Sequence, residues 1–249
     1  MTATAELANR LTDLLMLAHP PVAVSFRNGR PAAEAKPVVV QAAGCCYWAP
    51  AQEERLETQP SDHANCSVGS YTHGLIELEA AAAGDDTATL LSSGWVAESD
   101  LANAPNLPFR PQVIRYEPLA KADQPDVVLI RLSPRALMTL QGACPQIRLV
   151  TKPQCQIVPL AYAGEMVVSP GCAVSRARTN LPPGEMTCAF CGSALPEIVR
   201  RLERSAAADY AVAEYAITND RQHFVAPAER REQTRMARAL RALFPKGSC

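Results

Sequence analysis

The sequence has no excess of charge of either sign and no long apolar run. It holds 24 Lys and Arg against 25 Asp and Glu, a formal net charge of −1. Because nucleic-acid binding depends on basic residues that displace counterions, this balance argues against a nucleic-acid partner. No apolar run approaches the roughly 20 residues that cross a bilayer, so we expect no membrane partner. The N-terminal stretch lacks a basic region, so we expect no cleaved signal peptide and a cytoplasmic location.

The chain does not lack cysteine, although its length gives it no need of cross-links. A chain of 249 residues can bury roughly three-quarters of the surface that it exposes when unfolded, which suffices for a stable core. Nine cysteines are nevertheless present. Because a reducing cytoplasm keeps thiols free or bound to metal, these residues indicate metal or redox chemistry and not a disulfide framework.

Hydrophobic periodicity predicts a mixed α/β fold. Leucines at helical spacing predict a helix over residues 5–18, which a proline pair ends. Runs rich in branched residues predict strands at 22–26, 37–41, 113–116, 127–132 and 167–168. Cap and stop residues predict further helices at 75–83, 134–142, from 196 onward and at 228–244.

We expect one compact domain over residues 1–249, built from two similar halves. An apolar strand followed by two cysteines occurs twice, and Cys45 and Cys66 precede Cys155 and Cys172 by 110 and 106 residues. The halves would span 12–104 and 112–204, joined by a proline-rich connector at 103–111, with a C-terminal helical segment at 205–249. Such a repeat would place a metal or cluster site at the junction of the halves, whereas chance recurrence of short apolar strands is the alternative.

Four cysteines are the candidate ligands of one metal centre: Cys45, Cys66, Cys155 and Cys172. Coordination gives oxidisable thiols a reason to gather, because the metal stabilises their charged form. Three of the four follow glycine or asparagine, where the backbone can bend around a ligand. Their long separations do not match compact ferredoxin motifs, so buried structural cysteines are the alternative.

The other cysteines are weaker candidates. Cys188 and Cys191 form a C-x-x-C pair that could bind zinc or form a redox disulfide. No second pair and no histidine pair completes a zinc signature, and the apolar flanks favour core packing. Cys46 could replace Cys45 as a ligand, although on an extended backbone the two side chains would point to opposite sides.

Three residues are the candidate catalytic groups. His63 and His73 lie on either side of Cys66, where an imidazole could deliver a proton to a substrate or simply satisfy a backbone group. Asp62 could orient the His63 ring. Arg176 follows Cys172 closely and could hold an anionic substrate or remain a solvated surface residue.

These residues resemble the bacterial and archaeal family of domain of unknown function 169 over about residues 12–204. The resemblance rests on Cys45-Cys46-Tyr47-Trp48 with Ala51, the run from Asp62 to Gly74, Pro125 to Val128 with Pro134 and Leu140, and Ser169-Pro170-Gly171-Cys172 with Arg176 and Thr179. Its matching cysteines are the four candidate ligands. Ser175 stands where the family usually has a second glycine. Membership implies no activity.

The leading hypothesis is an iron-sulfur protein with one [4Fe-4S] cluster on Cys45, Cys66, Cys155 and Cys172. If three cysteines bind, an open iron could act on a small-molecule substrate, as in an iron-sulfur oxidoreductase or lyase. If all four bind, electron transfer or sensing is the expected role. The alternatives are a zinc-thiolate binding module without catalysis and a redox enzyme that uses Cys188 and Cys191. An electron donor and a homodimer are both compatible with the sequence.

Overall fold

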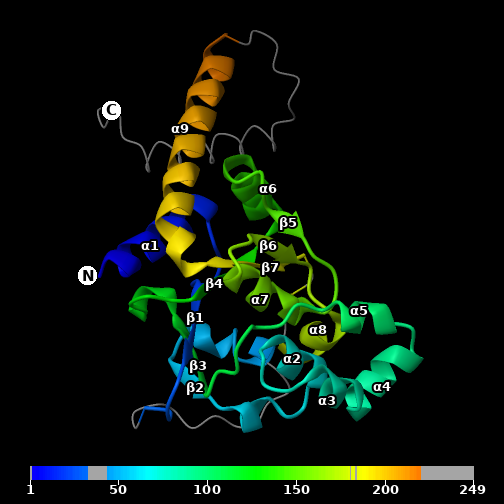
Figure 1. Ribbon diagram of the computed structural model, residues 1–249. Helices are drawn as coiled ribbons and strands as arrows, with labels where there is room; N and C mark the ends of the chain where they lie inside the picture. The colour runs from blue at the N-terminus through cyan, green and yellow to red at the C-terminus, as the bar shows by residue number, and fades with distance from the viewer. Residues whose placement is uncertain (1, 33–43, 180, 183, 220–249) are drawn as a thin grey trace.

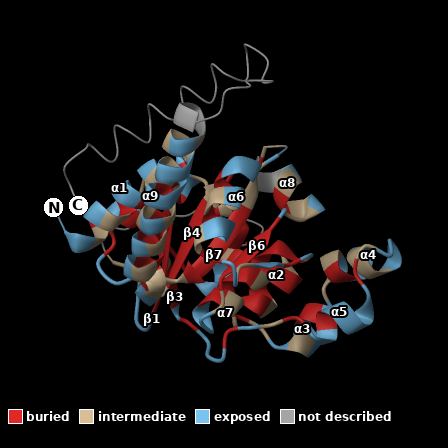
Figure 2. Ribbon diagram, turned by 90° about the horizontal axis from the view of Figure 1, so that it is seen from above, coloured by how far each residue is buried: buried red, intermediate tan, exposed pale blue. Residues whose placement is uncertain are grey.

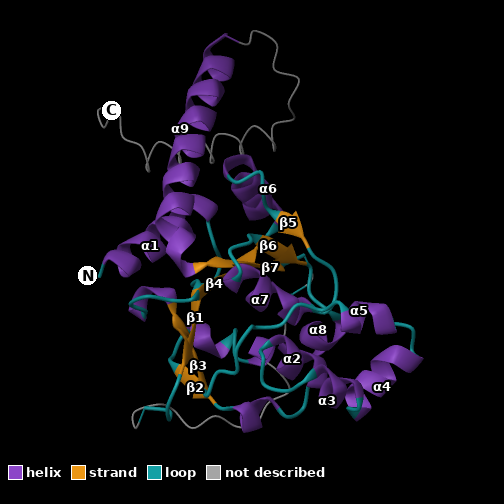
Figure 3. Cartoon of the chain, viewed as in Figure 1, coloured by secondary structure: helices purple, strands orange, loops and turns teal. Residues whose placement is uncertain are grey.

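The computed structural model describes residues 2–32, 44–179, 181–182 and 184–219, and of 178–179 and 216–219 only the backbone. Its centre is a seven-stranded mixed sheet in the order β2-β3-β1-β4-β7-β6-β5 (Figures 1 and 3). Only the β5–β6 pair is parallel among these neighbours. The strands are β1 (Val22–Arg27), β2 (Leu56–Thr58), β3 (Val113–Pro118), β4 (Val127–Leu132), β5 (Arg148–Leu149), β6 (Val167–Ser169) and β7 (Met186–Cys191). The mixed α/β prediction is confirmed.

Helices flank both faces of the sheet. The α-helices are α1 (Ala3–Leu15), α2 (Ser67–Thr72), α3 (Leu78–Ala82), α4 (Asp85–Ser92), α5 (Glu98–Ala102), α6 (Pro134–Ala143), α7 (Ile157–Tyr162), α8 (Ala173–Thr179) and α9 (Leu195–Asn219). Short 3₁₀ helices are η1 (Gly44–Cys46), η2 (Pro50–Gln52), η3 (Pro60–His63), η4 (Leu119–Lys121), η5 (Gln154–Gln156) and η6 (Gly192–Ala194). In Figure 1, α9 projects away from the sheet and α3 to α5 lie at the opposite end of the molecule.

Alternation along the strands divides the core into two parts. On β4, Val127 and Leu129 face one side, whereas Val128 and Ile130 face the other, as the two-residue period of a strand requires. One part of the core packs the sheet against α1, α6 and α9. The other packs it against η1, η2 and α7. Figure 2 shows the sheet as the buried centre between these layers. Cys45 belongs to the second part of the core and Cys66 packs against it, whereas Cys155 packs with Val68 and Leu101 in a small separate cluster.

Most predicted elements are present with shifted ends. The first helix ends at a left-handed Met16, before the proline pair, and the helix expected over 75–83 begins only at Leu78. The 134–142 helix is confirmed, with the Ser133 hydroxyl accepting a hydrogen bond from Ala136 N as its cap. The strand expected at 37–41 and the helix expected at 228–244 lie outside the described residues.

The element order shows a repeat that places β3 (Val113–Pro118) in the first unit, so the units would meet between β3 and β4 and not at the predicted connector 103–111. The two-halves hypothesis stays a prediction. Strands β1 and β4 are antiparallel neighbours at the centre of the sheet, β3 flanks β1, and β7 flanks β4. Further out, β2 lies beside β3 and β6 beside β7. In each half a 3₁₀ helix carries the first cysteine and a short α-helix follows the second. The expected boundary between 204 and 205 falls inside the continuous helix α9.

Within the described part of the chain, no helix combines the length and the apolarity needed to cross a membrane.

Candidate thiol site

Four separate elements bring the candidate ligands together. Cys45 lies in η1 and Cys155 in η5, while Cys66 immediately precedes α2 and Cys172 immediately precedes α8. Helix η1 contacts α2, η5 and α8, and α2 contacts η5. Cys45 and Cys155 are each 6% exposed, whereas Cys66 and Cys172 are partly exposed. The site therefore has a buried side within the core and a side that reaches solvent.

Electrostatic interactions connect all four thiols. The pKa of Cys45 is raised by a hydrogen bond with Cys46, by burial and by repulsion from Cys155 and Cys172. The pKa of Cys155 is raised by burial and by repulsion from Cys66 and Cys172. Because burial and the neighbouring thiols both disfavour charge, Cys45 and Cys155 hold their protons unless a cation binds among the sulfurs. The structure thus brings together the four cysteines that the sequence singled out.

The turns that carry the outer two cysteines are held by local hydrogen bonds. Asp86 accepts from the backbone N and the hydroxyl of Ser67, at 2.8 and 2.6 Å, which anchors the start of α2 beside Cys66. At the other turn, Ser175 N donates to Cys172 Sγ at 3.2 Å, and Cys172 N donates to the Ser175 hydroxyl at 3.1 Å. A serine in place of the usual glycine therefore stabilises this turn.

His63 and His73 are both fully buried beside the thiol site. The Thr58 hydroxyl donates to Ile114 O, so it accepts from His63 Nε2 at 2.9 Å, and the proton of His63 lies on Nε2. His73 Nδ1 lies 2.9 Å from Gly69 O, which only accepts, so His73 carries its proton on Nδ1. The remaining ring nitrogens, His63 Nδ1 and His73 Nε2, have no hydrogen-bond partner among the described residues.

Burial keeps both imidazoles neutral. It lowers the pKa of His63 to about 3, with repulsion from His73 adding to the effect. It lowers the pKa of His73 to about 4, although the hydrogen bond to Gly69 O opposes the shift. Both rings are therefore neutral at neutral pH, and the N–H of each is held in a hydrogen bond.

The predicted partner of His63 was wrong. The Asp62 carboxylate accepts from the backbone N of Gln59 at 2.7 Å and caps η3, so it does not orient the imidazole. Arg176 lies in α8, where its guanidinium donates to the backbone oxygens of Pro170 and Pro182. These bonds tie the loop around Cys172 together, so Arg176 supports that loop. The side chain of Arg178 lies outside the described residues.

Gly44 permits a close approach next to Cys45. A Cβ atom at this position would stand 2.5 Å from His73 Nε2 and 2.9 Å from the Tyr116 hydroxyl. Both atoms are buried, and neither has a hydrogen-bond partner among the described residues. The Tyr116 ring stacks on Tyr47 at 5.5 Å between centroids. Sequence reasoning missed Tyr116, because nothing in a strand residue about 70 positions away marks it as a neighbour of Cys45.

Cys188 and Cys191 do not form a redox or metal-binding pair. Both lie in β7, where three steps of about 3.3 Å separate their backbones by about 10 Å and put their side chains on opposite faces. A disulfide needs Cα atoms within about 7 Å. Cys188 is instead buried with Cys144 in the part of the core opposite the thiol site. The hypothesis of a redox enzyme that uses this pair is wrong for this fold.

Cys46 is closer to the site than the sequence suggested. Because η1 is helical and not extended, the Cys46 and Cys45 thiols form a hydrogen bond. Among the described residues, however, no three His, Cys, Asp or Glu side chains gather closely enough to hold one metal ion. Four sulfurs on one tetrahedral zinc would lie only about 3.8 Å apart at Zn–S bonds of about 2.3 Å. Thiolates that bind different irons of a cluster can stand further apart.

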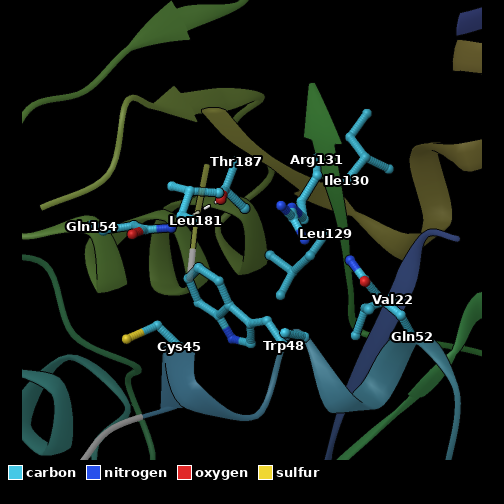
Figure 4. A pocket seen from close by; sticks show the side chains of 11 residues that line it. Val22, Cys45, Trp48, Gln52, Leu129, Ile130, Arg131, Gln154, Leu181 and Thr187 are labelled. Carbon is cyan, nitrogen blue, oxygen red and sulfur yellow. Dashed lines mark hydrogen bonds between the residues drawn. The ribbon is translucent and has the colours of Figure 1, made fainter. Parts of the chain in front are cut away.

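A small pocket adjoins Cys45 (Figure 4). Its cavity measures about 30 Å³, room for about two or three water molecules. Figure 4 shows Cys45 and Gln154 on one side of the Trp48 indole, and Arg131 and Gln52 on the other. The wall consists of Val22, Cys45, Trp48, Ala49, Gln52, Leu129, Ile130, Arg131, Gln154, Leu181 and Thr187. Sequence reasoning gave Gln154 no role, since a glutamine beside a cysteine carries no recognisable signal.

The comparison with known protein families identifies the family of this chain. The sequence profile of domain of unknown function 169, described as "Uncharacterised ArCR", matches residues 10–201. The chain belongs to this family. The match spans both groups of candidate cysteines and confirms the resemblance noted above. No curated protein and no solved structure matches this chain.

Proposed function

We propose that this protein binds a [4Fe-4S] cluster at Cys45, Cys66, Cys155 and Cys172 and acts on a small molecule there. The observation that carries the proposal is that thiols from four elements lie close enough to interact. The pKa of Cys45 is raised by a hydrogen bond with Cys46, by burial and by Cys155 and Cys172, and that of Cys155 is raised by burial and by Cys66 and Cys172. Soft thiolates favour iron-sulfur clusters or zinc over hard cations.

A cluster supplies one-electron redox chemistry and, at an iron that lacks a protein thiolate, a Lewis-acid position. The chain would supply ligands, hydrogen bonds and exclusion of water. Cys45 and Cys155 form the buried side, and Ser175 N already donates to Cys172 Sγ. His63 and His73 are buried and neutral, and His73 Nε2 lies against Gly44, so both rings would position the site through their fixed hydrogen bonds.

The test is iron and sulfide analysis of protein isolated without oxygen, repeated for each of the four cysteines changed to alanine. We expect about four irons and four sulfides per chain in the wild type, with the cluster lost when a ligand is removed. Retention in one of the four variants would identify an open iron and favour catalysis. Loss in all four would favour electron transfer or sensing.

The matched control is Cys188→Ala, because Cys188 is a fully buried thiol in the opposite part of the core. This variant should keep full iron and sulfide content even if its stability falls. Cys46→Ala should also retain the cluster. This result would show that Cys46, whose thiol forms a hydrogen bond with Cys45, is not itself a ligand. Zinc without sulfide would support the binding-module alternative. Wild-type protein that holds neither metal nor sulfide after anaerobic reconstitution would overturn the proposal.

A further inference from the structure

Gln154, in the wall of the pocket beside Cys45, carries a buried hydrogen-bond acceptor that nothing in the described structure satisfies. Gln154 is 2% exposed, and its Nε2 donates to the buried Thr187 hydroxyl at 2.9 Å. This bond fixes the orientation of the side-chain amide, so that Oε1 is its remaining hydrogen-bonding atom. Oε1 is buried and has no hydrogen-bond partner among the described residues. Since an unpaired buried carbonyl is destabilising, its retention indicates a partner that binds.

Gln154 lies where the thiol-bearing segments meet. It precedes Cys155 in η5, and it shares the pocket wall with Cys45. Its Oε1 stands 3.4 Å from the position that a Cβ on Gly171 would occupy, next to Cys172. A molecule that reached Oε1 would therefore lie among the cysteines of the thiol site.

The size and charge of the pocket limit what can bind. A cavity of about 30 Å³ holds about two or three waters. Because covalently bonded atoms lie closer together than neighbouring waters do, this is the room needed by a molecule of about four non-hydrogen atoms. Arg131, the cation in the wall, already pairs with Glu185 at 2.5 Å. Because this charge is compensated, the pocket offers no free cation to an anionic ligand. Gln52 and Thr187 are the other uncharged polar side chains of the wall, and mostly apolar side chains complete it.

We propose that this pocket binds a small uncharged molecule that donates an N–H or O–H hydrogen bond to Gln154 Oε1 and lies against Cys45. A primary amide or a short alcohol belongs to this class. The inference goes beyond the proposed function and does not depend on a cluster, because the protein chain supplies every contact.

Three isosteric probes test it: acetamide, acetone and acetate. All have four non-hydrogen atoms, but only acetamide is both uncharged and a donor. The full chain, freed of iron and labelled with ¹⁵N, is titrated while the indole N–H signals of its two tryptophans are followed. Trp48 lines the pocket and its Nε1 has no described partner, so its signal reports occupancy. The variant Trp95→Phe assigns the two signals.

We expect acetamide to shift the Trp48 signal saturably, with a dissociation constant in the micromolar to millimolar range. Acetone and acetate should bind at least about fivefold more weakly, because they leave Oε1 unpaired. Gln154→Leu should remove the preference for acetamide. Gln52→Leu, on the other side of the indole in Figure 4, should keep it.

Equal binding of acetone and acetamide, a preference for acetate, or no saturable shift would each overturn the proposal. If Gln154→Leu does not fold, the relative affinities of the wild type for acetamide, acetone and acetate still test the proposal. Because the protein in this titration carries no iron, its result is independent of the iron and sulfide analysis. The two experiments therefore distinguish a failure of the pocket proposal from a failure of the cluster proposal.

Discussion

The two buried histidines should make the stability of the iron-free protein depend steeply on pH. Burial lowers the pKa of His63 to about 3 and that of His73 to about 4, whereas an unfolded histidine titrates near about 6.5. Between these values the unfolded chain binds protons that the folded chain excludes. The stabilisation is therefore fully present above about pH 6.5 and is lost as the pH falls toward the folded pKa values.

The size of the effect follows from proton linkage. Each excluded proton changes the free energy of unfolding by about 1.4 kcal/mol per pH unit. Lowering the pH from about 7 to about 5 should cost about 2 kcal/mol for each histidine, or about 4 kcal/mol together. This range lies above the pH at which most carboxylates titrate, so the histidines dominate the slope.

Urea unfolding of iron-free protein at several pH values between 5 and 7 measures this slope. His63→Gln keeps a donor for Thr58 but cannot titrate, so it should halve the pH dependence. His19→Gln is the matched control, because His19 lies at the surface with 36% of its side chain exposed. If wild type and His63→Gln lose stability in parallel as the pH falls, the reasoning is refuted.

Three further predictions follow from single contacts. Gly44→Ala would place a methyl group 2.5 Å from His73 Nε2, so unfolding in urea should show a loss of about 1–3 kcal/mol; wild-type stability would contradict the close approach. Arg115→Met leaves the Glu57 carboxylate, 2% exposed, without the cation 2.6 Å away, which should cost about 3 kcal/mol. Adding Glu57→Gln should recover much of that loss, and no recovery would mean that charge is not the cause. Iron loading should release protons to a pH indicator, because a hydrogen bond with Cys46 and burial raise the pKa of Cys45; loading without release would show that the thiols were already ionised.

Much of the fold could be predicted from local pattern. Leucines at helical spacing mark α1, and branched runs mark β1 and β4, because periodicity records which side of an element is buried. The short helices were harder to predict. The chain between Cys66 and the connector folds into α2 to α5, four short helices of five to eight residues, too short to show a clear period.

The candidate site was predictable in its ligands but not in its surroundings. Turn-forming neighbours and the family pattern identify Cys45, Cys66 and Cys172 from sequence. The role of Asp62 could not be read in the same way, because a carboxylate beside a histidine can equally cap its own turn, as it does here. The C-x-x-C spacing left a zinc or redox pair open although its apolar flanks favoured core packing, because the meaning of the spacing depends on whether the segment is a strand or a turn.

The sequence by itself determined the mixed fold class, the cysteine-bearing turns and the balance of charge. Only the tertiary structure decided that η1, η5, α2 and α8 meet at one place and that the Cys188 thiol faces away from it. It also decided that the Gln154 carbonyl is buried without a described partner. The physical reason is that propensity and periodicity act over a few residues, whereas burial, repulsion between thiols and unpaired atoms arise between segments about a hundred residues apart.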